Sequence, residues 1–279
     1  MGIGVQMVIK RLPIMIAPFF GGILIDRFGV IGGVRIALLV SILFSAATIF
    51  IQRQIQNEPK SETPPERLNF FQSVREFNDP MRRLLVSDIL IRFCERIPYA
   101  WVVIFAMDYI GMSAKQVGVL ITVEMLAAAL CIIPASHYAD RYGREPFVIV
   151  TFIMFALFPI SLLIARGFPA YSFPLLLLAF IIRGFKEFGD TSRKALIIGY
   201  CDPARCGQMV GAYYLVRDLF VSTGAILGAY LWYLGAVPNF LGAAALGVAG
   251  TIFYIRTIRE QREDELENMK EEISRRRFR

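Results

Sequence analysis

Eight long runs of apolar residues dominate this sequence of 279 residues. A helix needs about 20 apolar residues to cross the hydrocarbon core of a bilayer, and each run is close to that length. Strands of a membrane barrel alternate between polar and apolar residues, whereas these runs are continuously apolar. We therefore expect an all-α polytopic membrane protein. The expected helices cover residues 5–25, 34–52, 84–107, 116–138, 147–165, 172–190, 208–233 and 237–256.

The Lys and Arg residues gather on one side of these helices. That side includes the segment 53–83, the end of the chain after residue 256, and Arg193 and Lys194 beyond the sixth run. Because cytoplasmic loops carry an excess of Lys and Arg, we expect both termini in the cytoplasm, with the chain in a plasma or inner membrane. The net charge of +7 lies in these connections, which argues against a nucleic-acid partner. The opposite side holds only Arg27, Arg35, Lys115 and Arg166.

The segment 53–83 differs from the other connections. It contains four prolines and many charged residues, and a connection of this length between packed helices usually has a function or separates two units. We interpret it as a cytoplasmic linker between two helices at 1–52 and a six-helix bundle at 84–256. A short amphipathic helix is expected near 66–77. Residues 257–279 are dense in Arg and Glu, which predicts a charged cytoplasmic helical tail.

The loop after the fourth run, residues 136–145, reads SHYADRYGRE. It resembles the G-x-x-x-D-R-x-G-R-K loop signature of the major facilitator superfamily. Gly143 suits a tight turn between two helices. Ser136 and Glu145 depart from the signature, which has glycine and lysine at these positions. The resemblance implies a gating role, in which charge contacts hold the cytoplasmic side closed, for four residues of this loop: Asp140, Arg141, Gly143 and Arg144.

The resemblance also assigns each apolar run to a numbered helix of that family. The last six runs correspond to helices seven to twelve of that family and the first two runs to helices five and six, so the sequence resembles the C-terminal part of a transporter. Alternating access moves one half of such a protein against the other. We therefore expect that the 279 residues alone do not transport. Three of the runs carry no charged residue, as expected of helices six, nine and twelve at the periphery of the fold: 36–52, 147–165 and 237–255.

Charged residues inside the other runs are the candidate site. Ionisable groups within membrane helices generally face a bundle interior or a wet cavity and mark functional sites. Asp88 and Asp190 lie near the ends of their runs, so we expect them at the membrane interface. Arg183 and Glu187 are spaced to neutralise each other on one helix. The candidates for substrate or proton coupling are Arg92, Glu95, Glu124, Arg183, Glu187, Arg217 and Asp218.

Glu124 is the most isolated of these charges along the sequence. The positions three and four residues away on either side are all apolar. An ionised carboxylate is costly at that depth, so Glu124 should be protonated or should pair with a residue of another helix, for which Arg217 is a candidate. Both a structural ion pair and a proton-coupling site fit this pattern.

These patterns predict a secondary active transporter that moves a small-molecule substrate across the lipid bilayer, with protons as a candidate coupling ion. The chain has one histidine and no enzyme motif, so we expect no enzymatic activity, no cofactor and no metal. Its four cysteines are too few for a disulfide framework and are expected as free thiols. The alternative is a non-transporting membrane scaffold or an inactive transporter fragment.

Overall fold

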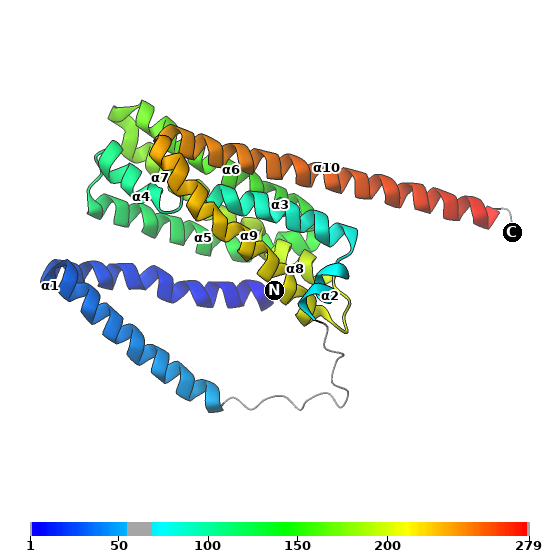
Figure 1. Ribbon diagram of the computed structural model, residues 1–279, viewed down its shortest axis with the longest axis horizontal. Coiled ribbons are helices and arrows are strands. Elements are labelled where there is room, and N and C mark those ends of the chain that lie inside the picture. The colour runs from blue at the N-terminus through cyan, green and yellow to red at the C-terminus, as the bar shows by residue number, and fades with distance from the viewer. Residues whose placement is uncertain (1, 55–68, 278–279) are drawn as a thin grey trace. The chain divides into compact units, whose positions relative to one another are not determined.

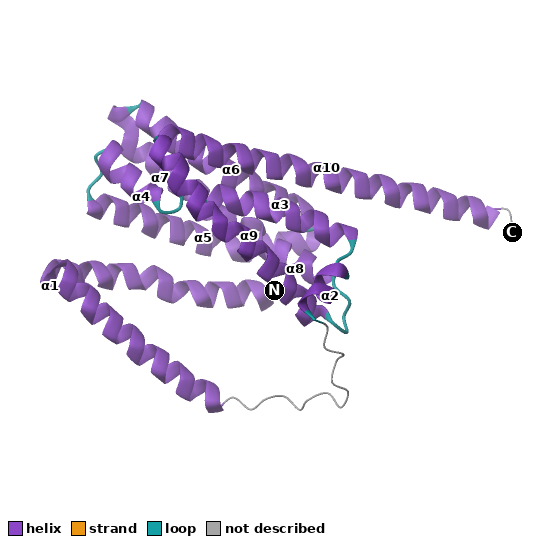
Figure 2. Cartoon of the chain, in the orientation of Figure 1, coloured by secondary structure: helices purple, strands orange, loops and turns teal. Residues whose placement is uncertain are grey.

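The computed structural model describes residues 2–54 and 69–277, and within these ranges every regular element is a helix (Figure 2). The all-α prediction is confirmed for this part of the chain. Contacts divide the chain into two units, Val8–Arg67 and Met1–Met7 with Leu68–Arg279, which are considered separately. Among the described residues, all four cysteines are free thiols, as expected.

The first unit contains most of α1, Gly2–Gln54. α1 breaks at Gly29, whose φ of 70° and ψ of 170° lie in a region open to glycine. The break separates the expected spans 5–25 and 34–52. The second half, Ile31–Gln54, is long and apolar enough to cross a membrane. Most side chains of 5–25 lie outside the described residues.

The second unit is a helical bundle. α10 packs along α3 and α6, α3 also contacts α9, and α5 contacts α7 (Figure 1). Its α-helices are α2 Phe70–Arg75, α3 Asp79–Arg96, α4 Trp101–Ile104, α5 Ala114–Tyr142, α6 Glu145–Gly167, α7 Ser172–Gly184, α8 Asp190–Gly199, α9 Cys206–Leu234 and α10 Ala236–Arg277. Three short helices of other types complete it: η1 Phe105–Tyr109, η2 Pro169–Tyr171 and η3 Phe185–Gly189.

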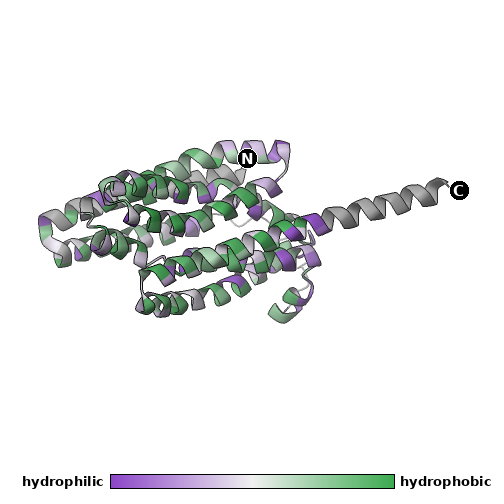
Figure 3. Ribbon diagram, turned by 90° about the horizontal axis from the view of Figure 1, so that it is seen from above, coloured by the Kyte–Doolittle hydropathy of each residue, from purple (hydrophilic) through white to green (hydrophobic). Residues whose placement is uncertain are grey.

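By length and composition, six helical segments in the described ranges can cross a membrane. Large apolar side chains remain exposed along them, as on Leu130 of α5 and Ile226 of α9, and hydrophobic residues extend along most of the bundle helices (Figure 3). Such surfaces fit contact with lipid. The six segments are Ile31–Gln54, Gln116–Tyr142, Glu145–Gly167, Pro169–Gly199, Cys206–Leu234 and Ala236–Glu260.

The helix expected at 84–107 differs from the prediction at both ends. It begins earlier, at Asp79, because the side chain of Asn78 accepts a hydrogen bond from the backbone N–H of Met81 and caps the first turn. It also stops at Arg96, and residues 97–100 form a turn before α4 and the π-helix η1. Pro98 has no backbone N–H to donate to an α-helical ladder, which contributes to this interruption.

The helix expected at 172–190 is longer than predicted. After α7 the backbone tightens into the 3₁₀-helix η3 and then continues as α8 to Gly199. At Gly189 the chain approaches α6 so closely that a Cβ atom would lie 2.2 Å from the carbonyl oxygen of Phe147. As a result, Arg193 and Lys194 lie on a helix and not in the expected loop.

Two clusters of buried apolar residues hold the bundle together. One cluster includes Met81 and Ile91 of α3 with Phe152 of α6. The other includes Phe105 of η1 and Phe180 of α7. Within a membrane these side chains stabilise the fold mainly through van der Waals packing, because lipid is as apolar as the bundle interior. The short helix α2 lies within the expected amphipathic segment and packs against α9, and residues 55–68 lie outside the described residues.

Candidate functional site

Eleven ionisable side chains of the second unit are joined by ion pairs, and we call this group the ion-pair network. The network consists of Asp88, Arg92 and Glu95 on α3, Glu124 on α5, Arg183 on α7, Lys186 on η3, Asp190, Arg193 and Lys194 on α8, and Arg217 and Asp218 on α9.

Glu95 lies at the centre of the network. One carboxylate oxygen accepts a hydrogen bond from Arg92 Nη1 at 2.7 Å, and the other accepts one from Lys186 Nζ at 2.7 Å. Hydrogen bonds between oppositely charged groups are about twice as strong as neutral ones. Glu95 therefore ties α3 to η3, the segment where the backbone leaves α-helical geometry.

Glu124 forms one end of the network. Its side chain is buried, and its Oε1 lies 3.2 Å from Arg183 Nε and 3.9 Å from Lys186 Nζ. The guanidinium carbon of Arg183 also lies 5.0 Å from the centre of the Phe158 ring, a cation–π distance. The expected partner, Arg217, contacts Asp88 and Asp218 instead. The prediction of an interhelical partner is confirmed, but Arg183 and Lys186 provide it.

The other end of the network surrounds Asp88 and Asp190. Arg193 contacts both carboxylates, with its Nη1 2.6 Å from Asp88 Oδ2. The hydroxyl of Tyr213 donates a further hydrogen bond to Asp88. Arg92 Nη2 lies 3.2 Å from Asp190 Oδ1.

Asp88 and Asp190, which were expected at the membrane interface, are both buried inside the bundle, and their depth in the membrane stays a prediction. Asp88 lies well inside α3, because that helix begins at Asp79. Asp190 begins α8, which continues the helical run toward Gly199, so the expected helix end is an interior position. Both residues therefore lie farther from the end of a helical run than the sequence analysis placed them.

Local backbone geometry positions these side chains. Asp88, Arg92 and Glu95 follow the i, i+4 and i+3 spacings that place residues on one face of a helix. At Gly184 a Cβ atom would lie 2.6 Å from the carbonyl oxygen of Glu124, so only glycine allows α7 to approach α5 this closely. This approach brings Arg183 and Lys186, on either side of Gly184, to the carboxylate of Glu124.

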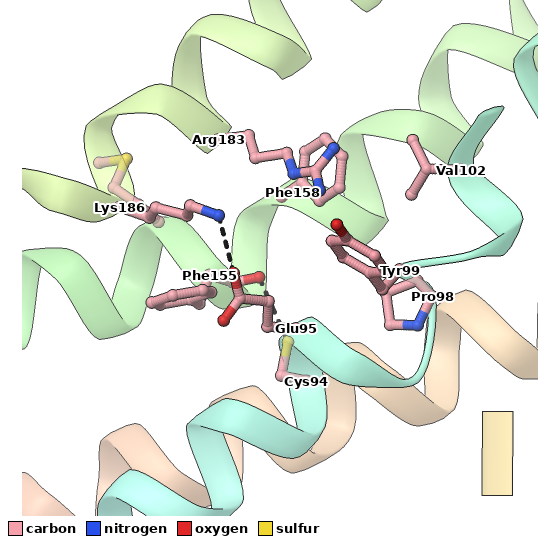
Figure 4. Close-up of a pocket in the computed structure, with 10 residues that line it drawn as sticks. Cys94, Glu95, Pro98, Tyr99, Val102, Phe155, Phe158, Arg183 and Lys186 are labelled. Atoms are coloured by element: carbon pink, nitrogen blue, oxygen red, sulfur yellow. Dashed lines mark hydrogen bonds and ion pairs between the residues drawn. The ribbon is translucent and has the colours of Figure 1, made fainter. Parts of the chain in front are cut away.

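Two cavities border Glu95. The first, shown in Figure 4, has a volume of about 10 Å³, which is close to the space of one water molecule. Glu95, Tyr99, Arg183 and Lys186 line it together with apolar side chains, and Lys186 points toward Glu95.

We call the second cavity the charged cleft, and its volume is about 250 Å³. It is wide enough for a small solute and borders both α3 and α9. Its lining residues are Arg92, Glu95, Arg96, Asp190, Arg193, Lys194, Tyr214, Arg217, Asp218 and Val221.

The loop between α5 and α6 has the tight turn that the sequence predicts. Gly143 has a φ of 94°, in the region where glycine is favoured. Arg144 Nη1 donates a hydrogen bond to the carbonyl oxygen of Ala195 at 3.4 Å, which links the loop to α8. Asp140 and Arg141 are exposed at the end of α5.

Six of the seven candidate coupling residues belong to the network, and the seventh, Glu187, lies half-buried on η3. Sequence reasoning missed the other five members of the network. It placed Asp88, Asp190, Arg193 and Lys194 at helix ends or in a loop, and it did not select Lys186. The i, i+3 and i+4 spacing of Asp190, Arg193 and Lys194 is the signal that indicates a continuing helix face.

The second unit matches a known family. The family model of the Major Facilitator Superfamily matches residues 84–278, which cover most of α3 and all later helices of the unit. A comparison with curated proteins gives no match. The match includes the whole ion-pair network and agrees with the all-helical fold and the apolar membrane spans. The chain therefore belongs to the Major Facilitator Superfamily of transporters and is an integral, multi-pass membrane protein.

Proposed function

We propose that this protein takes part in secondary active transport, in which a small solute moves by alternating access and its movement is coupled to an ion. The observation that carries the proposal is the ion-pair network inside the bundle. Ionisable groups in a membrane interior are costly, and their retention favours a role in binding or coupling. The charged cleft, which borders the network, is the proposed solute site.

Glu124 is the proposed coupling carboxylate. Its partners Arg183 and Lys186 lie on the run α7–η3, whereas Glu124 lies on α5. Protonation of Glu124 removes the charge that attracts these two cations, and Lys186 then interacts with Glu95 alone. Proton binding thereby loosens α5 from the run α7–η3, which is the kind of helix movement that alternating access needs.

The loop residues Asp140, Arg141, Gly143 and Arg144 are the proposed cytoplasmic gate. The hydrogen bond from Arg144 to Ala195 supports this role, because it connects the loop to the helix that carries Asp190 and Arg193. We further infer that both termini face the cytoplasm of a plasma or inner membrane. Arg193 and Lys194 lie on a helix and leave the set of loop charges, yet the remaining Lys and Arg residues still favour this orientation.

The test replaces Glu124 with glutamine in the native gene of the host cell. Uptake of labelled carboxylates, phosphates, sugars, amino acids and organic cations is then measured with and without an imposed pH gradient. Glu76→Gln is the matched control, because Glu76 also pairs with an arginine, Arg205 at 2.8 Å, but is exposed. We expect Glu124→Gln to exchange solute but no longer concentrate it, while Glu76→Gln behaves as the parent protein.

Three outcomes contradict parts of this proposal. If Glu124→Gln retains concentrative uptake with unchanged pH dependence, Glu124 is not the coupling group. If the variant loses only expression and thermal stability, its ion pairs with Arg183 and Lys186 are structural. If deletion of the gene changes the uptake of no solute in the panel, the protein does not transport these solutes. The scaffold function then replaces transport.

A further inference from the structure

The charged cleft has an excess of positive charge. Five basic residues line it, against three acidic residues. Each of the three carboxylates is already paired within the network: Glu95 with Arg92 and Lys186, Asp190 with Arg92, Arg193 and Lys194, and Asp218 with Arg217. Asp88, which is not a lining residue, also pairs with Arg92, Arg193 and Arg217, so an excess of one positive charge remains available to a ligand.

Arg96 stands apart from the other cations of the cleft. In the described part of the chain, it forms no ion pair with a carboxylate, and its guanidinium carbon lies 5.6 Å from the centre of the Tyr99 ring. The side chain is exposed, so it keeps its hydrogen-bond donors available. An arginine guanidinium offers these donors as a planar fork, which fits a carboxylate or a phosphate with two parallel hydrogen bonds.

Arg217 provides a second cation that a ligand can reach. Its guanidinium carbon lies 4.5 Å from the centre of the Tyr214 ring, which fixes the plane of the group beside the cleft. Its partner Asp218 is largely exposed, with 62% of its side chain accessible. Arg217 also lies 3.5 Å from the buried carboxylate of Asp88, and this contact can remain when a ligand binds. Because the exposed ion pair with Asp218 contributes little, an anion can replace Asp218 at Arg217 at small cost.

We propose that the charged cleft binds a small water-soluble organic anion through a carboxylate or phosphate group, with Arg96 and Arg217 as its contacts. The cleft volume of about 250 Å³ is just below the range of about 300–1,000 Å³ found for drug-sized ligands, which favours a small solute. This inference rests on the proposed transport function and gives its substrate class.

The experiment measures binding to the purified full chain by isothermal titration calorimetry at constant ionic strength. Succinate and inorganic phosphate are the anionic probes, glucose is the neutral probe and choline is the cationic probe. We expect one or both anions to bind, and glucose and choline not to bind. Binding of glucose or choline without binding of either anion would overturn the proposal.

Variants locate the bound anion. Arg96→Gln should weaken anion binding about tenfold or more, and Arg96→Lys should recover part of the loss because it keeps the charge. Arg166→Gln is the matched control, since Arg166 is also an exposed arginine beside a tyrosine, 5.3 Å from the Tyr109 ring, but is outside the cleft. Equal losses in Arg96→Gln and Arg166→Gln would contradict the proposed site.

A second substitution acts in the opposite direction. Asp218→Asn removes a negative charge that competes for Arg217, so we expect it to tighten anion binding several-fold. Weaker binding in this variant would contradict the proposal. Misfolding cannot imitate the expected result, because a misfolded variant would bind the anion more weakly and only tighter binding supports the proposal.

Nanodiscs of phosphatidylcholine and of phosphatidylglycerol compare a soluble anion with a lipid headgroup as the occupant of the cleft. We expect the protein to bind the soluble anion in both kinds of disc. Binding that is present in phosphatidylcholine discs but lost in phosphatidylglycerol discs at every probe concentration would assign the cleft to a lipid headgroup and overturn the proposal.

Uptake in cells distinguishes a failure of the anion site from a failure of the transport function. Anion binding without anion uptake contradicts the transport function alone. Uptake restricted to neutral or cationic solutes contradicts the anion site alone.

Discussion

Two of the segments that carry the ion-pair network, α3 and the run from α7 to α8, differ in backbone geometry from α6, whose residues 147–165 carry no charge. α6 contains Pro159 and yet is one α-helix from Glu145 to Gly167. α3, in contrast, ends before Pro98, and the run from α7 to α8 passes through the 3₁₀-helix η3. A proline alone therefore does not decide whether a helix of this bundle breaks.

Close backbone contacts accompany the irregular segments. At Gly228 of α9 a Cβ atom would lie 2.4 Å from the carbonyl oxygen of Ile97, so α9 meets α3 at its break. Gly189, at the end of η3, approaches the backbone of α6 in the same way. Departures from α-helical geometry within a helix often mark functional positions. The comparison indicates that close packing and buried charge shape these segments together.

The largest expected effect comes from removing a buried charge of the network. Arg193→Met leaves the buried carboxylates of Asp88 and Asp190 with fewer partners, so we expect a loss of about 3–5 kcal/mol of stability. Lys194→Met is the control, because Lys194 also contacts Asp190 but is about one-third exposed, and it should cost less than about 1 kcal/mol. Thermal unfolding in detergent measures both. Equal losses of stability in the two variants would contradict the claim that the buried charge contributes more than the partly exposed one.

The next effect tests the close contact at the end of η3. Gly189→Ala places a methyl group against the backbone of Phe147, which cannot rotate away, so we expect a loss of about 1–3 kcal/mol. Gly199→Ala, at the end of α8, meets no atom within 4 Å and should be neutral or slightly stabilising. A similar melting temperature for both variants would show that the approach of η3 to α6 is not tight.

A smaller effect on stability, but a clear effect on kinetics, is expected from the loop. Asp140→Asn changes an exposed residue outside the charged cleft. We expect slower turnover in uptake experiments, with equilibrium solute affinity within a few-fold of the parent protein. Loss of binding with normal turnover would assign Asp140 to the solute site instead of the gate.

The helical fold can be predicted from the sequence, because a run of about 20 consecutive apolar residues is typical of a membrane-spanning helix. The tight turn at Gly143 follows equally, since few residues other than glycine adopt its φ of 94°. The sequence also indicates the interior position of Glu124, because no opposite charge lies one helical turn away from it. These features depend on local sequence.

The partners within the site do not follow from local sequence. The pairing of Glu124 with Arg183 depends on Gly184, which lets α7 approach α5, and this contact joins residues far apart in the chain. The burial of Arg193 depends on the continuation of the helix through α8 to Gly199, beyond the expected helix end at residue 190. Hydropathy places a helix end where apolar residues stop, but ion pairs between helices stabilise the polar turns beyond that point.

A double-mutant cycle on Glu124 and Arg183 tests most directly the claim that paired charges inside the bundle form the site. The melting temperatures of Glu124→Gln, Arg183→Gln and the double variant are compared with that of the parent protein. Each single change leaves a buried charge with one fewer partner, whereas the double change removes both charges. The account predicts that the double variant loses clearly less stability than the sum of the single losses. Strictly additive losses would contradict it.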